Sequence, residues 1–211
     1  RTITRPVNVN GNYNSSVGYD GTIPLKGREF TCNPHIYLNY KNNVNFINGQ
    51  KNTINELFSE TGLDLGYNVQ EKFNISIGGI FDYHAPHSSL NNQNNKPYSS
   101  QEFSANGSVH LPAKILIESN AVYTLNSSRT NGYNINYVVW NASVSKNFLK
   151  NENLIVSVDA TDILDQNINT SRTVTDNYIT DTKSNVVRRY ILLRAVFKFN
   201  SNKTKEGDDD Y

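Results

Sequence analysis

The chain has 211 residues, of which 20 are basic and 19 acidic, so its formal net charge is only +1. Hydrophobic residues make up 36% and charged residues 18%, while 34 asparagines supply much of the polarity. No run approaches the roughly 18 apolar residues of a transmembrane helix, the charge argues against nucleic-acid binding, and the single cysteine, Cys32, excludes an internal disulfide. Low hydrophobicity fits either a disordered chain or a β-barrel that is polar on one face only, and periodicity separates the two.

Apolar and polar residues alternate with a period of two along nine segments, and no segment predicts a convincing helix. In the last segment, Ile191 and Leu193 lie on one face and Arg188 and Arg194 on the other. Only a β-strand sorts its side chains in this way. The predicted strands cover residues 7–23, 30–41, 56–69, 73–83, 102–111, 115–125, 138–145, 154–161 and 187–199.

The links between the predicted strands alternate in length. Short links cover residues 25–29, 70–72, 112–114 and 149–153, and mostly longer, polar links cover 42–55, 84–101, 126–134 and 162–185. This alternation predicts an antiparallel up-and-down sheet with unlike ends. In outer-membrane barrels the short turns are periplasmic and the long loops are extracellular.

The predicted strands are long. Residues 7–23 far exceed the mode of about 5–6 residues in globular proteins, whereas a tilted membrane strand needs about 9–11. A water-soluble β-sandwich is the alternative, since its strands also alternate. The polar faces carry amides and hydroxyls rather than Lys and Glu, and this composition favours an all-β, transmembrane β-barrel.

Nine strands do not close a bacterial barrel, which usually has an even number of strands. An open backbone edge cannot face lipid, because each unsatisfied polar group costs several kcal/mol. We therefore expect residues 1–199 to be part of a larger barrel, followed by a polar acidic tail at residues 200–211. The lack of an initiating Met and of a signal peptide agrees with this expectation.

Several stretches resemble a known family. These are WNASVSKNFLKNENLIVSV at 140–158, DILDQN at 162–167, SRTVTDNYITD at 171–181 and RYILL at 189–193, with RPVNVNGNY at 5–13 and VNFINGQKN at 44–52. Together they are similar to the barrel of TonB-dependent-receptor-like outer-membrane proteins, in the branch with a carboxypeptidase-regulatory-like N-terminal domain. The resemblance covers nearly the whole chain as an extended pattern.

The resemblance implies a 22-stranded barrel in the outer membrane of a Gram-negative bacterium, of which this chain supplies the C-terminal nine strands. It implies uptake of a bulky or scarce nutrient, powered by TonB. The implied partners are the remaining strands, a plug domain, the lipid bilayer, TonB through a part outside this chain, and a surface lipoprotein or other subunits. Neither a plug nor a TonB box is found in this sequence, and either Phe199 or Tyr211 would be the aromatic assembly signal.

Charged residues on the predicted polar faces are the candidate lumen-facing set. They are His35, Glu60, Asp64, Glu118, Asp159, Arg188 and Arg194. Charge facing a lumen costs little, whereas Arg or Lys on the lipid face near the midplane costs about 2–4 kcal/mol. Two interpretations remain open: some of these residues contact a plug or line a solute path, or they form cross-strand ion pairs in a hydrated interior.

Other motifs predict little chemistry. His84 and His87 lie close in sequence, but no third ligand is placed by spacing, so we expect no metal site. Asp208, Asp209 and Asp210 lack the staggered spacing and sharp turn of a Ca²⁺ loop. No catalytic set stands out, so we expect neither an enzyme nor a cofactor. The alternative to a transporter is a non-transporting barrel that acts as a surface scaffold or binds partners.

Overall fold

The computed structural model describes residues 6–25, 27, 29–70, 72–90, 95–127, 136–149, 152–174 and 179–199. Within these ranges the chain is almost entirely β-strand, and its one helical segment is the 3-10 turn Pro112–Lys114. In chain order the strands are β1 (Tyr13–Asp20), β2 (Ile23–Pro24), β3 (Phe30–Ile47), β4 (Gln50–Val69), β5 (Phe73–Ser88), β6 (Tyr98–Leu111), β7 (Ile115–Asn126), β8 (Tyr137–Phe148), β9 (Leu154–Thr161), β10 (Asn169–Val174), β11 (Ile179–Ser184) and β12 (Tyr190–Phe197).

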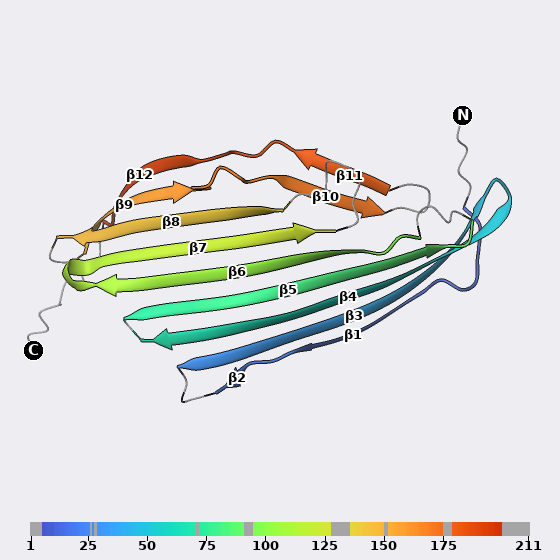
Figure 1. The fold of residues 1–211 in the computed structure, drawn as a ribbon, viewed down its shortest axis with the longest axis horizontal. Helices are drawn as coiled ribbons and strands as arrows, with labels where there is room; N and C mark the ends of the chain where they lie inside the picture. The colour runs from blue at the N-terminus through green and yellow to red at the C-terminus, as the bar shows by residue number, and fades with distance from the viewer. Residues whose placement is uncertain are drawn as a thin grey trace, which may run out of the picture.

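The main sheet is antiparallel and runs up and down in the order β1-β3-β4-β5-β6-β7-β8-β9-β12, which confirms the predicted architecture. The short strand β2 extends the first strand along β3, and β10 pairs only with β11. Figure 1 shows the short turns at one end of the sheet and the longer links, with the β10–β11 hairpin, toward the other.

The predicted loop 42–55 is wrong, because β3 and β4 continue through it as a long hairpin. The hairpin turns at Asn48 and Gly49, whose φ angles are 52° and 79°. Two residues with positive φ form the turn that matches the twist of paired strands, and Asn-Gly is the sequence that best adopts it. The many Asn residues around the turn are polar strand residues, not loop residues.

Several other boundaries differ from the prediction, and β5 and β6 extend into the predicted link 84–101, to Ser88 and from Tyr98. The link 162–185 contains the β10–β11 hairpin, and the last strand begins at Tyr190 rather than at residue 187. The predicted first strand 7–23 is divided into β1 and β2, and residues 7–12 are not strand. Gly11 takes a φ of 103°, which ends the extended conformation before β1.

The strand register places the predicted apolar positions on one side of the main sheet, here called the apolar face. One cross-strand row of this face consists of Val69, Phe73, Val109, Ile117, Val144, Val158 and Leu193. The opposite side, the polar face, carries the amides, hydroxyls and charges. A slip of one residue in any strand would exchange the two faces, so this row confirms the alternation read from the sequence.

The apolar face is exposed rather than packed. Ile191 and Leu193 are 73% and 72% exposed, and the only buried hydrophobic residues in the described ranges are Val44 and Tyr98. A soluble β-sandwich would bury its apolar face in a core about 10 Å thick. The described sheet has no such core, so the sandwich alternative is excluded.

The exposed hydrophobic residues of the apolar face form a belt, here called the apolar belt, which ends before the strands do. At the short-turn end Lys146 lies in line with the apolar positions, and its Nζ sits 5.2 Å from the centre of the Phe148 ring. A long cationic side chain can reach back to the aqueous interface in this way. On β5 the belt runs from Phe73 to Phe81, close to the roughly 9–11 residues that a tilted strand needs to cross the hydrocarbon.

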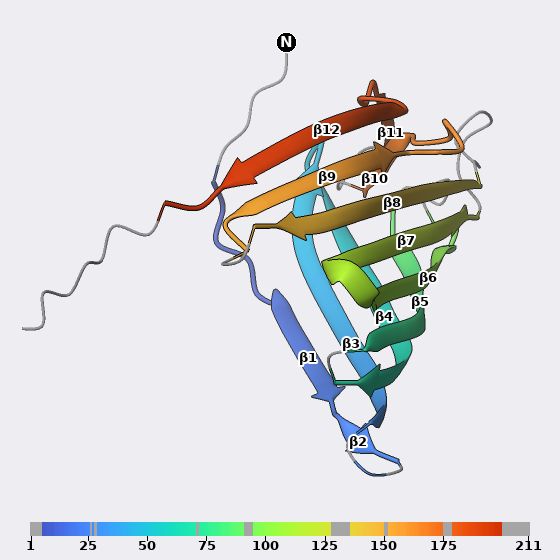
Figure 2. The ribbon, with the colours of Figure 1, turned by 90° about the vertical axis from the view of Figure 1, so that its left-hand side faces the viewer.

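The main sheet bends into an open trough with β1 and β12 at its two edges (Figure 2). Along β3 the apolar Ile36 and Leu38 are exposed, whereas His35 and Tyr37, which alternate with them, are half-buried. Side chains on the inside of a bend crowd one another, so this difference indicates that the polar face lines the trough.

Two neighbouring short turns are joined by an ion pair at the end of the sheet. The ammonium of Lys114 lies 2.8 Å from a carboxylate oxygen of Glu152. This hydrogen bond and charge lower the pKa of Glu152. Ala113 and Lys114 hold positive φ angles of 64° and 60°, which are uncommon for residues with a side chain. The ion pair links this strained turn between β6 and β7 to the turn between β8 and β9, at the short-turn end of the sheet.

Candidate functional site

A histidine cluster joins three strands on the polar face. His35 on β3 contacts Asp20 on β1 through Nδ1, and its Nε2 lies 2.5 Å from Oε1 of Glu60 on β4. The register places Asp20 directly opposite His35 and Gly62 on its other side. Because Gly62 has no side chain, the imidazole has room to reach Glu60, its diagonal neighbour.

Asp64 lies in the same hollow as the histidine cluster. Its carboxylate lies flat over Gly78 of β5, so close that a β-carbon there would be 1.9 Å from Oδ1. Any side chain at Gly78 would therefore displace the Asp64 carboxylate from this position. The hollow that the histidine cluster and Asp64 line has a volume of about 490 Å³.

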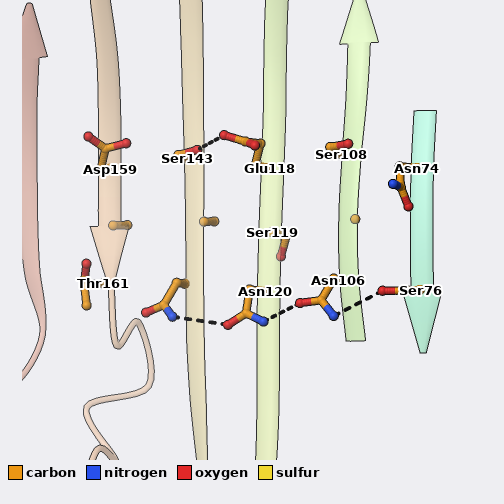
Figure 3. Close-up of a pocket in the computed structure, with 14 residues that line it drawn as sticks. Asn74, Ser76, Asn106, Ser108, Glu118, Ser119, Asn120, Ser143, Asp159 and Thr161 are labelled. Carbon is orange, nitrogen blue, oxygen red and sulfur yellow. Dashed lines mark hydrogen bonds between the residues drawn. The ribbon is translucent and has the colours of Figure 1, made fainter. Parts of the chain in front are cut away.

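An amide ladder crosses the middle of the polar face from β5 to β8 (Figure 3). Asn141 donates to Asn120 at 3.4 Å, Asn120 donates to Asn106, and Asn106 donates to Ser76 at 3.2 Å. These four residues share one row of the register. Asn side chains both donate and accept, so a row of them can satisfy itself without charges.

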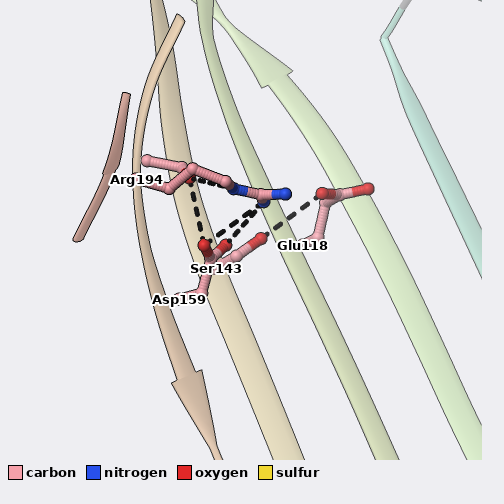
Figure 4. A network of polar contacts seen from close by, with 5 residues as sticks. Glu118, Ser143, Asp159 and Arg194 are labelled. Carbon is pink, nitrogen blue, oxygen red and sulfur yellow. Dashed lines mark hydrogen bonds and ion pairs between the residues drawn. The ribbon is translucent and has the colours of Figure 1, made fainter. Parts of the chain in front are cut away.

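An arginine cluster, drawn in Figure 4, lies toward the β12 edge, and its members Asp159, Ser143 and Glu118 lie beside the ladder in Figure 3. The Arg194 Nη2 atom lies 3.2 Å from a carboxylate oxygen of Asp159, and Nε donates to Ser157 at 3.2 Å. On the next strands Ser143 donates to Glu118 at 3.3 Å. Arg194 is more than half exposed, so its ion pair contributes only about 0–1 kcal/mol.

The amide ladder and the arginine cluster border one open hollow of about 450 Å³. Its lining is made of amides, hydroxyls and the carboxylates of Glu118 and Asp159. Such a wall offers many hydrogen-bond donors and acceptors beside the small apolar residues Ala142 and Ala160. It can hold water, a polar solute or a polar protein surface, and no catalytic arrangement of nucleophile and base is present among the described residues that line it.

The structure brings most of the predicted lumen-facing residues onto the polar face. His35, Glu60, Asp64, Glu118, Asp159 and Arg194 all lie there, in the two clusters or beside them. Arg188 does not join them: it precedes β12 and lies 3.9 Å from Asp165. The two cross-strand pairs, His35–Glu60 and Arg194–Asp159, are of the kind expected for a hydrated interior. That the polar face borders a closed lumen remains a prediction.

The two histidines considered as metal ligands lie in β5, not in a loop. His84 stacks on Tyr98 with ring centres 4.5 Å apart, and its Nδ1 lies 3.1 Å from Glu56. Within the described ranges no group of three or more His, Cys, Asp or Glu residues could hold a metal ion. Asp208, Asp209 and Asp210 lie outside the described residues, as does the rest of the tail 200–211.

Two fully buried polar residues were not predicted from the sequence. Asn52 accepts hydrogen bonds from Ser88, Ser89 and Leu90, which ties the β3–β4 hairpin to the end of β5. Asp162, directly after β9, accepts from the backbone N–H groups of residues 166 and 167. The sequence carried no local signal for the second, because Ile163 and Leu164 follow Asp162 directly and its carboxylate accepts from residues four and five positions further on.

The fold and the two faces together define a class of protein. An up-and-down antiparallel sheet with an exposed apolar belt, an amide-rich opposite face and unlike ends is the wall of a transmembrane β-barrel. None of the described residues forms a helix long and apolar enough to cross a membrane.

A family model described as the Outer membrane protein beta-barrel family matches residues 1–199. The chain therefore belongs to this family, and it resides in the outer membrane of Gram-negative bacteria. Searches among curated proteins and among solved structures gave no significant match.

Proposed function

We propose that this chain forms part of the barrel wall of a TonB-dependent receptor that takes up a nutrient across the outer membrane. The remaining barrel strands, a plug domain and the contact with TonB are supplied by parts outside this chain. The protein is a transporter rather than an enzyme. A surface lipoprotein or another subunit is a further candidate partner.

The observation that carries the proposal is that the edge strands β1 and β12 of the described sheet do not pair with each other. Barrels of about eight strands fill their interior with side chains, whereas barrels of about 16–22 strands enclose a channel or a plug. Here nine strands in sequence leave β1 and β12 unpaired with each other, and the polar face keeps two open hollows of about 450 and 490 Å³. This supports a wide barrel whose inner wall is built of amides and ion pairs, as passage or retention of a polar solute requires.

A non-transporting surface scaffold is the second candidate, and one feature favours it. The β10–β11 hairpin pairs only with itself and belongs to the link between β9 and β12, at the end of the sheet with the longer links. A hairpin of this kind could present Asn169, Thr170 and Ser171 to a partner outside the membrane. The two candidates differ in whether the whole protein engages TonB.

The test is binding of the whole purified protein to the periplasmic domain of TonB, measured by surface plasmon resonance in detergent. We expect saturable binding to TonB. Cells should also remove a nutrient from the growth medium, and this removal should stop when the gene for this protein or the gene for TonB is deleted. No binding, together with medium depletion that is unchanged by loss of TonB, would leave the scaffold as the better account.

A further inference from the structure

A row of aromatic side chains crosses the polar face, although most of that face is built of amides and hydroxyls. Phe58 on β4, His84 on β5 and Tyr98 on β6 are direct cross-strand neighbours. The ring centres of Phe58 and His84 are 4.6 Å apart, and His84 stacks on Tyr98. His84 follows Phe81, at which the apolar belt ends on the side of the long links. In an outer-membrane barrel that side is extracellular, so the aromatic row lies toward the outer opening.

Tyr37 on β3 and Phe58 form a corner at one end of this row. Their ring centres are 6.0 Å apart and their planes are inclined by 59°, so the rings make two walls rather than a stack. The Tyr37 ring lies against Gly18 of β1, where a β-carbon would be 3.1 Å from it. Both rings are half-buried. The corner therefore offers two ring surfaces to one bound group.

Two carboxylates lie beside these rings on the same face. Glu60 is the direct cross-strand neighbour of both Tyr37 and Asp82, and it is two residues from Phe58. Like charges directly opposite each other on a sheet are destabilising. Glu60 contacts His35, and Oδ1 of Asp82 is buried without a hydrogen-bond partner. In the described part of the chain, neither Glu60 nor Asp82 forms an ion pair with a Lys or Arg.

Other carboxylates of the polar face have a cationic partner. Asp159 pairs with Arg194. Glu56 lies directly opposite Lys41, and it is 3.1 Å from His84. The shortage of positive charge is therefore local to the corner, and a cation bound there would offset the repulsion between the two carboxylates.

We propose that the corner of Tyr37, Phe58, Glu60 and Asp82, here called the cation corner, binds the substituted ammonium group of a solute that enters from outside. Aromatic faces attract a cation within about 6 Å of the ring centre, and aromatic walls are a common way to recognise quaternary ammonium groups. A neutral solute would leave the carboxylate repulsion in place, and an anion would add to it. Among the described residues no group of three or more His, Cys, Asp or Glu could hold a metal ion, which favours an organic cation.

The rest of the solute has room beside the cation corner. Glu60 also lines the hollow of about 490 Å³ that contains His35 and Asp64, and this volume lies within the range of about 300–1,000 Å³ of small-molecule sites. The inference rests on the proposed function, because it names the class of solute. Its test does not involve TonB, so a failure here would reject the solute class and leave binding to TonB unaffected.

The test is binding of choline to the whole protein in detergent, measured by isothermal titration calorimetry. Dimethylbutanol, the uncharged carbon analogue of choline, is the control ligand. We expect saturable binding of choline at one site and at least tenfold weaker binding of dimethylbutanol. Mg²⁺ at the same concentration should not displace choline.

Two variants test the rings and the charge separately. Phe58→Leu removes one wall but keeps an apolar side chain, and its matched control is Phe30→Leu, on the apolar face at the short-turn end. Asp82→Asn removes one carboxylate but can still accept the hydrogen bond from Ser100, and its control is Glu152→Gln in a short turn. We expect choline binding to weaken at least fivefold in Phe58→Leu and Asp82→Asn, and to stay within twofold of the wild type in both controls.

Heat-modifiable migration in SDS gels first establishes that each variant assembles. Asp82→Asn should also raise the thermal midpoint of the ligand-free protein, because it removes a like-charge pair, so its loss of binding is not a loss of folding. Should Phe58→Leu not assemble, Tyr37→Leu removes the other wall and should weaken binding equally. The proposal is overturned by a wild type that does not bind choline, by equal binding of dimethylbutanol, or by unchanged binding in the assembled variants of the corner.

Discussion

Adjacent residues on β12 face opposite environments. Leu193 is 72% exposed and pairs with Val158 on the apolar face, whereas Leu192 is 49% exposed and pairs with Asp159 on the polar face. The two leucines have the same hydrophobicity, so only the parity of the strand separates their surroundings. This makes them a matched pair for testing which face meets lipid.

Leu193→Arg should block or strongly reduce assembly, because a cation near the midplane of the lipid face costs about 2–4 kcal/mol. Leu192→Arg should be tolerated, since its guanidinium would lie beside Asp159 on the polar face. The measurement is the assembled fraction in outer-membrane extracts, judged by heat-modifiable migration. Equal effects of the two substitutions would contradict the assigned facing.

A second test at the residue scale concerns Asp162, which is fully buried. Its two carboxylate oxygens accept backbone N–H bonds at 3.0 and 3.1 Å. Asp162→Ala leaves these donors without a partner and should lower the free energy of unfolding by about 1–3 kcal/mol. Asp165→Asn, in the same turn but half-exposed and 3.9 Å from Arg188, is the control and should change the free energy of unfolding by less than ~1 kcal/mol, because Asn tolerates the positive φ of 55° at this position. Urea unfolding in detergent measures the free energy of unfolding of both variants. An equal loss in the two would argue against a stabilising role of the Asp162 hydrogen bonds.

At the scale of elements, the β3–β4 hairpin depends on its turn. Gly49 has a φ of 79° with no atom near its missing β-carbon, so backbone conformation and not space limits this position. Gly49→Ala should destabilise the hairpin by about 1–2 kcal/mol. Asn48→Gly, at a φ of 52°, should be nearly neutral. Amide hydrogen exchange near Asn45 and Thr53 measures the opening of the tip. Unchanged exchange in Gly49→Ala would show that the turn can adopt another conformation.

Strand interiors were predictable from the sequence, and several of their ends were not. Alternation identifies strands such as β5 and β7 because, within the apolar belt, every second side chain lies on the apolar face and the others lie on the polar face. Beyond the belt the outer parts of β3 and β4 are rich in polar residues and keep few alternating apolar ones, such as Val44 and Phe46, so they resemble a loop. Only the turn residues Asn48 and Gly49 distinguish a hairpin there.

The candidate site was predictable in facing but not in partners. Parity alone placed His35, Glu60 and Asp159 on the polar face. Their contacts depend on register between strands far apart in sequence, such as Arg194 with Asp159. The glycines that let side chains lie flat, such as Gly78 under Asp64, could be assigned a role only from the structure. The last strand was predicted to begin too early because the alternation continues past the true start of β12, and the facing of Arg188, which precedes that strand, stays a prediction.

At the scale of the whole molecule, the sheet is stabilised by its surroundings rather than by a core. Only Val44 and Tyr98 are buried hydrophobic residues in the described ranges. In water the exposed belt would drive aggregation, and the open edges of β1 and β12 would pair with other chains. In a bilayer the same belt is satisfied by lipid, and we propose that further strands of a closed barrel pair with the two edges.

The central claim is that the apolar face contacts lipid while the polar face contacts water. Spin labels placed one at a time along β7, in the whole protein with Cys32→Ser and inserted in a bilayer, test it most directly. Labels at Ile117, Ala121 and Tyr123 should collide mainly with oxygen, and labels at Glu118 and Asn120 mainly with a water-soluble nickel complex. Accessibility that does not alternate along β7, or that alternates in the opposite phase, would contradict the account.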